Sequence, residues 1–237
     1  MDYRNRIFNM DCLAGLSLLP DNSIDMVLTD LPYGTTGGAW DTLLPLPDLW
    51  RQLNRVTKRN GAMVFTAAQP FTTTLIASNR KNFRYCWYWI KNQVTGFPFS
   101  HFQPLRCVEE IAVFYRAAPT YTPQGLVALE HPRRQEGKHF TEESVYRKDG
   151  LSRTTLQRFT NYPRQILSFP CQREGLHPTQ KPVALFEYLV RTYTDPGQLV
   201  LDCCIGSGTT KVACRNAGRD YVGFEIDRKY YEIAQAR

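Results

Sequence analysis

The sequence predicts an α/β fold, with a largely parallel β-sheet covered by helices on both faces. Short apolar runs typical of buried strands, at residues 24–29, 62–66 and 199–203, alternate with longer stretches of helical periodicity. This alternation favours parallel strands, because the crossover between two parallel strands usually contains a helix that packs on the sheet. Ligands bind beyond the carboxyl ends of the strands in such sheets, so we expect the chemistry in the loops that follow strands.

The individual elements follow from local patterns. The strand at 24–29 ends at Asp30-Leu31-Pro32-Tyr33-Gly34, where proline and glycine stop regular structure. Asn60-Gly61 is a turn or helix-stop signal between the first long helix and the strand at 62–66. The remaining pattern predicts helices over 43–57, 69–80 and 182–193 and from Thr209 onward, and further strands over 85–90, 108–115 and 221–225.

Length and charge indicate one domain with a basic insertion. The 237 residues are 43% hydrophobic, enough for one core, and we expect a single domain over 1–237. The alternation stops over 116–173, a stretch too long for an ordinary connection. This stretch holds ten Lys or Arg against five Asp or Glu, in a chain of formal net charge +7. The excess favours a polyanionic partner such as nucleic acid.

Several classes of protein are disfavoured by what the sequence lacks. No apolar run is long enough to cross a bilayer, and the N-terminal residues do not form a signal peptide, so we expect a soluble, cytoplasmic protein without a membrane partner. The seven cysteines include no C-x-x-C pair, and the four histidines lack spaced partner ligands. We expect reduced cysteines that serve packing, and no metal site.

Two segments near the C-terminus suggest a nucleoside-containing ligand. Gly206-Ser207-Gly208 follows the strand at 199–203 and directly precedes a helix, so the backbone can approach a ligand there. A G-x-G pattern alone describes an empty strand-to-helix turn equally well, and the spacing of a phosphate-binding P-loop is missing. Glu225 ends a strand about twenty residues later, where a carboxylate can accept both hydroxyls of a ribose.

Together with three further motifs, these residues resemble the DNA amino-methyltransferases. Asp202–Thr210 is similar to the S-adenosylmethionine-binding motif I of that family, and Gly223–Asp227 is similar to motif II. Asp30–Tyr33 resembles the catalytic D-P-P-Y motif IV. His177–Pro182 resembles motif X, and Asp11 resembles the acidic residue of motif III. The resemblance covers nearly the whole chain.

The order of the motifs resembles that of the beta group of these enzymes, with the catalytic motif first, the basic insertion second and motif I last. Smaller matches to phage and prophage adenine methylases are Trp40-Asp41, Gln69-Pro70-Phe71, Trp89-Ile90-Lys91-Asn92, Thr95-Gly96-Phe97 and Pro104-Leu105-Arg106 followed by Glu110. The resemblance implies a Rossmann-like methyltransferase sheet with an inserted target-recognition region, S-adenosylmethionine as cofactor and double-stranded DNA as substrate. It also implies a homodimer and, within a restriction–modification system, a cognate restriction endonuclease.

The resemblance assigns a catalytic role to each residue from Asp30 to Tyr33. The Asp30 carboxylate and the Leu31 carbonyl would accept the two hydrogens of the target amine, Pro32 would shape the turn, and Tyr33 would stack on the base. An exocyclic amine becomes positively charged as it attacks, so nearby acceptors stabilise the transition state. The base has to be flipped out of the duplex to reach them.

For the cofactor, the resemblance places Asp202 near the methionine amino group, Glu225 on the ribose and Asp11 near the adenine amine. The segment from Thr179 to Lys181 would lie near the carboxylate end. The complete expected set is Asp11, Thr179, Gln180, Lys181, Asp202, Gly206, Ser207, Gly208, Thr209, Glu225 and Asp227.

The basic residues of the insertion occupy the target-recognition position of the family, where arginine and lysine side chains can contact phosphates and guanine edges. The alternative is a solvated loop that binds nothing. The residues expected to contact DNA are Arg133, Arg134, Lys138, Arg147, Lys148, Arg153, Arg158 and Arg164.

Two departures from the family pattern leave alternatives open. Leu31 replaces the first proline of D-P-P-Y, and Cys203-Cys204 replaces the usual Pro-Phe after the motif I aspartate. Adenine N6 is favoured over cytosine N4 because Asp, and not Ser, begins motif IV. The alternatives are a cytosine-N4 methyltransferase and a non-catalytic DNA-binding protein of the same fold, and methylation of RNA or protein ranks below both.

Overall fold

The computed structural model describes residues 2–35, 37–38, 41–136, 154–172 and 175–237. The chain divides into two compact units, a larger one of Met1–Thr122 with Gln165–Arg237 and a smaller one of Pro123–Arg164. The smaller unit is shorter than the insertion expected at 116–173, because Arg116–Thr122 and Gln165–Gln172 belong to the larger unit.

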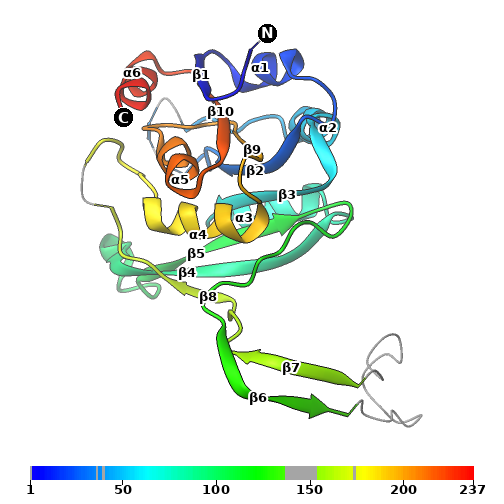
Figure 1. Cartoon of the computed structure of the whole chain (residues 1–237). Coiled ribbons are helices and arrows are strands. Elements are labelled where there is room, and N and C mark those ends of the chain that lie inside the picture. The colour runs from blue at the N-terminus through cyan, green and yellow to red at the C-terminus, as the bar shows by residue number, and fades with distance from the viewer. Residues whose placement is uncertain (1, 36, 39–40, 137–153, 173–174) are drawn as a thin grey trace. The chain divides into compact units, whose positions relative to one another are not determined.

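One eight-stranded sheet forms the centre of the larger unit and confirms the expected α/β class (Figure 1). The first five strands in spatial order are parallel, while β5 runs antiparallel to both β3 and β4, and β8 is parallel to β4. The spatial order is β1 (Arg6–Asn9), β10 (Asp220–Glu225), β9 (Leu199–Asp202), β2 (Ile24–Asp30), β3 (Thr57–Ala67), β5 (Arg106–Phe114), β4 (Phe83–Thr95) and β8 (Ile166–Ser168).

Helices cover both faces of this sheet because its central strands are apolar on both sides. Along β2, Val27 packs with one set of helices, whereas Met26 and Leu28 pack with the other. The helices on the Val27 side are α1 (Cys12–Leu18), α2 (Leu46–Val56) and α3 (Phe71–Ser78). Those on the opposite side are α4 (Val183–Tyr193), α5 (Thr209–Ala217) and α6 (Arg228–Ala236).

The turn or helix stop expected at Asn60-Gly61 is wrong, because α2 ends at Val56 and both residues lie inside β3. The register between β2 and β3 shifts there, so that Lys58–Gly61 stand opposite the single residue Asp25. A Cβ atom added at Gly61 would lie 2.7 Å from the Asp25 carbonyl oxygen. The glycine therefore permits a close backbone approach within a strand and does not mark its start.

The smaller unit contains an antiparallel pair, β6 (Val127–Gln135) and β7 (Thr155–Thr160). Neither strand was expected from the sequence, because most of their described side chains are exposed and no apolar alternation marks them. In the described part of the chain, no helix is long and apolar enough to cross a bilayer. No group of His, Cys, Asp and Glu among the same residues is arranged to hold a metal ion.

Candidate active site

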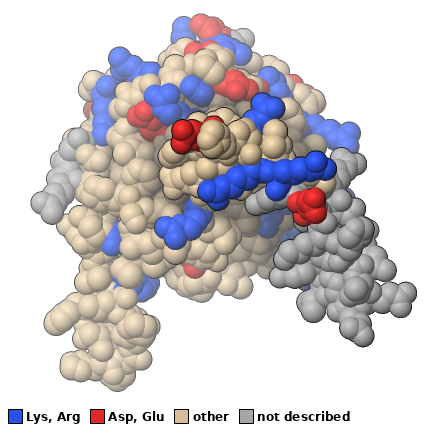
Figure 2. Space-filling view, turned by 60° about the horizontal axis from the view of Figure 1, so that its bottom comes forward, with Lys and Arg blue, Asp and Glu red and all other residues tan. Residues whose placement is uncertain are grey.

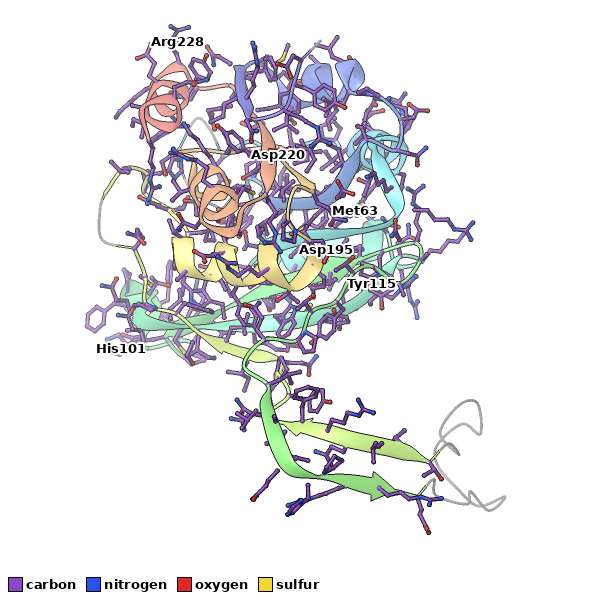
Figure 3. All side chains as sticks on the ribbon, viewed as in Figure 1. Met63, His101, Tyr115, Asp195, Asp220 and Arg228 are labelled. Carbon is purple, nitrogen blue, oxygen red and sulfur yellow. The ribbon has the colours of Figure 1, made fainter. Side chains whose placement is uncertain are left out.

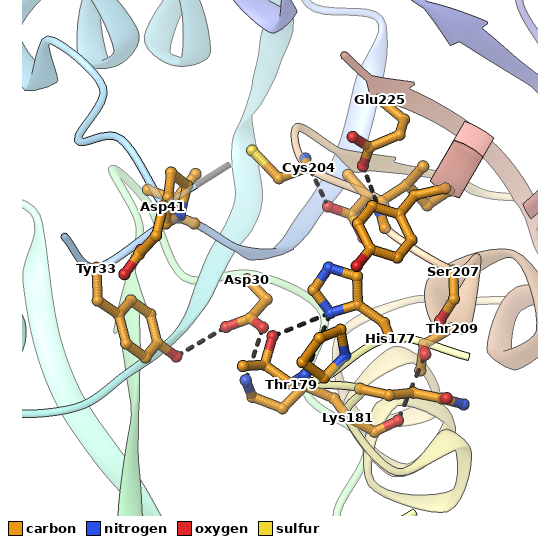
Figure 4. Close-up of a pocket in the computed structure, with 18 of the residues that line it drawn as sticks. Asp30, Tyr33, Asp41, His177, Thr179, Lys181, Cys204, Ser207, Thr209 and Glu225 are labelled. Atoms are coloured by element: carbon orange, nitrogen blue, oxygen red, sulfur yellow. Dashed lines mark hydrogen bonds and ion pairs between the residues drawn. The ribbon is translucent and has the colours of Figure 1, made fainter. Parts of the chain in front are cut away.

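A pocket of about 1060 Å³ lies at the carboxyl ends of the parallel strands. Its floor includes the last residues of three neighbouring strands, Glu225 of β10, Asp202 of β9 and Asp30 of β2. Side chains at the ends of adjacent parallel strands meet at one edge of the sheet, which is why three carboxylates far apart in the sequence line one cavity. Figure 4 shows two of them, Asp30 and Glu225.

Backbone amides hold the Glu225 carboxylate in place. Its two oxygens accept hydrogen bonds from the amides of Gly206, at 2.8 Å, and Asp227, at 2.9 Å. Burial raises the pKa of Glu225, and these backbone bonds oppose the rise. Because Gly206 belongs to the loop after β9, this contact also ties the glycine loop to the end of β10.

The Asp202 carboxylate is the most enclosed of the three, with 2% of the residue exposed. It accepts hydrogen bonds from the Thr210 hydroxyl and from the Cys204 amide at 3.0 Å. Burial raises the pKa of Asp202 to about 7, although these hydrogen bonds lower it in part. A carboxyl with this pKa is ionised more readily when a cation lies beside it.

The two glycines of the loop serve different purposes. Both have left-handed backbones, with φ of +53° at Gly206 and +86° at Gly208, which a residue with a side chain rarely adopts. A Cβ at Gly208 would lie 3.2 Å from the Cα of Ala234, so this glycine lets α6 pack closely. Gly206 instead presents its backbone to the pocket. Among the described residues outside its own turn, the His177 ring alone lies within 4 Å of an added Cβ, at 3.9 Å.

The Asp30 carboxylate is surrounded by donors. Oδ1 accepts hydrogen bonds from the Tyr33 hydroxyl at 2.7 Å and the Thr66 hydroxyl at 2.5 Å. Oδ2 accepts one from the Lys181 ammonium at 2.6 Å. Burial and the neighbouring Asp30 carboxylate raise the pKa of Tyr33 well above its ordinary value. Tyr33 is therefore a neutral hydrogen-bond donor to Asp30 at physiological pH.

Lys181 lines the pocket, and its ammonium faces two carboxylates of the protein. The resemblance predicts that this residue lies near the carboxylate end of the cofactor. In the structure its ammonium is bonded to Asp30 and lies 3.5 Å from Glu109. Lys91 in turn pairs with Glu109 at 3.0 Å. Burial on its own lowers the pKa of Lys181, but the two carboxylates outweigh it and the net pKa is raised. Lys181 is thus a buried cation in a chain of alternating charges.

The loop after β2 is fixed by packing and by one further carboxylate. Leu31, which replaces a proline of the family motif, is buried in the core on the side of α1 and α2. Asp41 accepts hydrogen bonds from the amides of Gly34 and Thr35, both at 2.8 Å. Tyr33 lies against Phe71 with ring centroids 5.3 Å apart and nearly parallel planes. One face of the Tyr33 ring is therefore covered by protein.

The rest of the expected cofactor set is only partly brought to the pocket. Asp11 lines it and also caps α1 by accepting from the Ala14 amide at 3.0 Å. Gly208 and Asp227 do not line the pocket, and Asp227 instead caps α6 through the Lys229 amide at 2.8 Å. The expected residues that do line it are Asp11, Thr179, Gln180, Lys181, Asp202, Gly206, Ser207, Thr209 and Glu225.

Four residues with polar or aromatic contacts in this region were missed by sequence reasoning. Thr66, Lys91 and Glu109 join the network around Asp30, and the Tyr230 ring lies 4.2 Å from the His177 ring. Thr66 had a usable signal, because it ends the predicted strand next to the one that carries Asp30. The other three depend on contacts between distant segments that no local pattern reveals.

The described residues among those expected to contact DNA fall in the smaller unit. Arg133 and Arg134 lie on β6 and Arg158 on β7, and all three are exposed, as is Arg164. Lys138, Arg147, Lys148 and Arg153 lie outside the described residues. Lys and Arg side chains are also spread over the face of the molecule shown in Figure 2, in keeping with the net charge of +7.

The sequence of the chain is similar to those of known methyltransferases. The Type II methyltransferase M1.MboII of Moraxella bovis is 24% identical, over 97% of this chain and 95% of the relative. The DNA adenine methyltransferase YhdJ of Escherichia coli (strain K12) is 26% identical, over 98% of this chain and 81% of the relative. Both similarities extend over almost the entire chain.

Solved structures show the same fold. The M1.HpyAVI–SAM complex superposes with a TM-score of 0.64 at 23% identity, covering 98% of both chains. The cytosine-N4-specific PvuII DNA methyltransferase superposes with a TM-score of 0.73 at 16% identity, covering 98% of this chain and 85% of the other. A family model described as DNA methylase matches residues 24–236. The chain therefore belongs to the N6/N4 family of DNA methylases, which use S-adenosylmethionine as methyl donor.

Proposed function

We propose that this DNA methyltransferase acts on the N6 amino group of adenine in double-stranded DNA, after the target nucleotide leaves the duplex. The observation that carries the proposal is the Asp30 carboxylate, which lines the same pocket as the buried Asp202 and Glu225. An aspartate at the start of the catalytic motif favours adenine, and so does the name of the E. coli relative.

The residues of the pocket fit S-adenosylmethionine. The buried Asp202 carboxylate would pair with its ammonium group, and the fixed Glu225 carboxylate would accept the ribose hydroxyls. Asp11 would lie near the adenine ring, and Gly206 leaves its backbone open to the ligand. When bound, the cofactor supplies an electrophilic methyl group on a sulfonium ion.

The hydrogen bonds of Asp30 leave a defined place for the target amine. A carboxylate offers about four acceptor positions, two on each oxygen. The Tyr33 and Thr66 hydroxyls use both positions of Oδ1, and Lys181 uses one of Oδ2. The second position of Oδ2 would accept one hydrogen of the amine, and the Leu31 carbonyl would accept the other. Charge that develops on the amine would then be stabilised by a carboxylate that is already oriented.

The methylated base identifies the reaction. The purified chain is incubated with labelled S-adenosylmethionine and unmethylated DNA, the DNA is digested to nucleosides, and the labelled nucleoside is identified. We expect N6-methyladenine, and its loss with Asp30→Ala. N4-methylcytosine would contradict the choice of base. Cofactor binding without any label in DNA would favour a non-catalytic DNA-binding protein, the alternative raised by the Leu31 and Cys203-Cys204 departures.

Cofactor affinity is expected to fall at acid pH. Asp202 must be ionised to pair with the cofactor ammonium, and burial raises its pKa to about 7. Below that pH the carboxyl is protonated, so we expect Kd to rise by up to about tenfold for each pH unit and to level off above it. Calorimetry from pH 5 to pH 8 checks this.

An Asp202→Asn variant is the control for that titration, because it binds more weakly and removes the contribution of this carboxyl. Any slope that it retains belongs to other titrating groups of the pocket. Among them are Glu225, whose pKa is raised by burial, and His177, whose pKa is lowered by burial. Parallel pH profiles for the natural chain and the variant would show that Asp202 does not pair with the ammonium.

The smaller unit is proposed to bind the DNA backbone through its exposed arginines. Changing both Arg133 and Arg134 to Gln should weaken duplex binding and make its salt dependence shallower, by roughly 0.9 in the log–log slope for each lost phosphate contact. Fluorescence anisotropy over a salt series measures this. Arg51→Gln is the matched control, because it removes an exposed arginine from α2. A slope equal to that of the natural chain would refute the assignment.

A further inference from the structure

The loop between β4 and β5, residues 96–105, exposes three phenylalanines. The exposed fractions of Phe97, Phe99 and Phe102 are 76%, 54% and 88%. Single exposed apolar residues are common on protein surfaces, but a group of large aromatic rings on one loop marks a contact surface. Nothing in the catalytic pocket uses these side chains, since none of the three lines it.

The loop is bonded internally and does not fold its rings back onto the protein. Gly96 takes a left-handed backbone, with φ of +92°, and starts a short 3-10 turn, η1 (Phe97–Phe99). The amides of Phe102 and Gln103 both donate to the Phe99 carbonyl, at 2.9 and 3.0 Å. These bonds satisfy the backbone locally, so the aromatic rings are presented to solvent on a structured loop.

The loop continues the rim of the catalytic pocket. Lys91, Gln93 and Thr95 of β4 line that pocket, and Gly96 follows directly. The Asn92 side chain accepts a hydrogen bond at 2.8 Å from the amide of Cys171, another lining residue. At the rise of a strand, Gly96 lies roughly 16 Å from Lys91. Figure 3 shows His101 at the outer end of the β4–β5 hairpin.

The charge of this segment suits a polyanion. From Gln93 to Val108 the chain contains no Asp or Glu, and it carries Arg106 and His101. Aromatic rings beside a cationic side chain and without acidic neighbours are suited to stacking on nucleic acid bases, with the cation near a phosphate. The segment from Gln93 to Val108 itself holds no carboxylate that could pair with a basic protein.

We propose that the 96–105 loop contacts DNA beside the pocket opening, where its phenylalanine rings stack on bases left exposed when the target nucleotide leaves the duplex. The inference rests on the proposed function, because base flipping opens a gap in the stack next to the pocket. Apolar side chains inserted at such a gap replace part of the lost stacking. The loop would thus favour the flipped state of the DNA.

The test compares two fluorescein-labelled duplexes, one intact and one with a single abasic site that mimics the gap. A Phe97→Ser, Phe102→Ser double variant should bind the abasic duplex roughly 10- to 100-fold more weakly and change binding to the intact duplex by less than about threefold. Phe102→Trp should keep the natural affinity, and the abasic duplex should quench its emission more strongly than that of the natural chain, whose four tryptophans give the background. Leu18→Ser is the matched control, since Leu18 is 53% exposed at the end of α1, a helix that begins at the pocket and runs away from it.

Two results would overturn the inference. One is equal binding of both duplexes by the double variant and the natural chain. The other is a dimer of the natural chain that dissociates in the double variant by analytical ultracentrifugation, which would assign the rings to a second copy. Methylation of DNA by the natural chain is measured in parallel. If the natural chain methylates DNA but the double variant binds both duplexes as the natural chain does, the loop inference alone is wrong. If no methylated base is found, the proposed function is wrong, whatever the duplex comparison shows.

Discussion

Asp30→Asn is expected to lower kcat by about 10²- to 10³-fold while the cofactor Kd stays within about threefold. The change keeps the size of the side chain but removes the negative charge that would stabilise the positive charge developing on the target amine. It also replaces one acceptor oxygen with an amide donor, next to the Lys181 ammonium, if the amide nitrogen takes the Oδ2 position. Cofactor binding is spared because it is assigned to Asp202 and Glu225, which end other strands.

Single-turnover methylation and calorimetry of S-adenosylmethionine together measure this effect. Asp25→Asn is the matched control, because Asp25 is a buried carboxylate on the same strand that pairs with Lys58 at 2.6 Å and accepts from the Leu199 amide. It should lower the free energy of unfolding without a comparable loss of kcat. If Asp30→Asn methylates DNA at the rate of the natural chain, Asp30 takes no part in the reaction.

The sequence was sufficient to place the three carboxylates of the site because their positions depend on the sheet. Asp30, Asp202 and Glu225 each end an apolar strand, and parallel strands bring their carboxyl ends to one edge. Lys181 lies in a segment without regular structure, where the spacing of residues in the sequence does not determine where a side chain points. Its partners in the structure, Asp30 and Glu109, are 151 and 72 positions away in the chain, and only the folded structure brings them within reach.

Two of the elements that were not predicted, β6 and β7, escaped detection for a physical reason. The strands β6 and β7 of the smaller unit have mostly exposed side chains, so they lack the alternation of apolar and polar residues that marks a half-buried strand. Gly61 is typical of a turn, yet here it permits a bulged strand to pass the Asp25 carbonyl. Prediction from local propensity fails where a residue is required by a single tertiary contact, as Gly61 is.

Lys181→Met is expected to lower kcat by about 10- to 100-fold with little change in cofactor Kd, which identifies Lys181 as a positioning residue for Asp30. Lys181 is 6% exposed, and its ammonium lies between the Asp30 and Glu109 carboxylates. It holds Oδ2 of Asp30 at 2.6 Å. Without it Asp30 can rotate about its side-chain bonds, and the two carboxylates lose the cation that separates them. The geometry that leaves one position of Oδ2 for the target amine is then lost.

Cofactor binding separates this role from the one that the resemblance implied. A lysine that binds the cofactor carboxylate would, when replaced by methionine, raise Kd and leave kcat at saturating cofactor nearly unchanged. A lysine that orients Asp30 does the opposite, and Lys181→Arg should restore part of kcat by keeping a cation at Oδ2. Lys211→Met is the matched control, because Lys211 is a similarly buried lysine whose ammonium donates to the carbonyls of Ala234 and Gln235. Since both replacements remove a buried ammonium, a fall in kcat confined to Lys181→Met can be attributed to the loss of the contact with Asp30 and not to a general loss of stability.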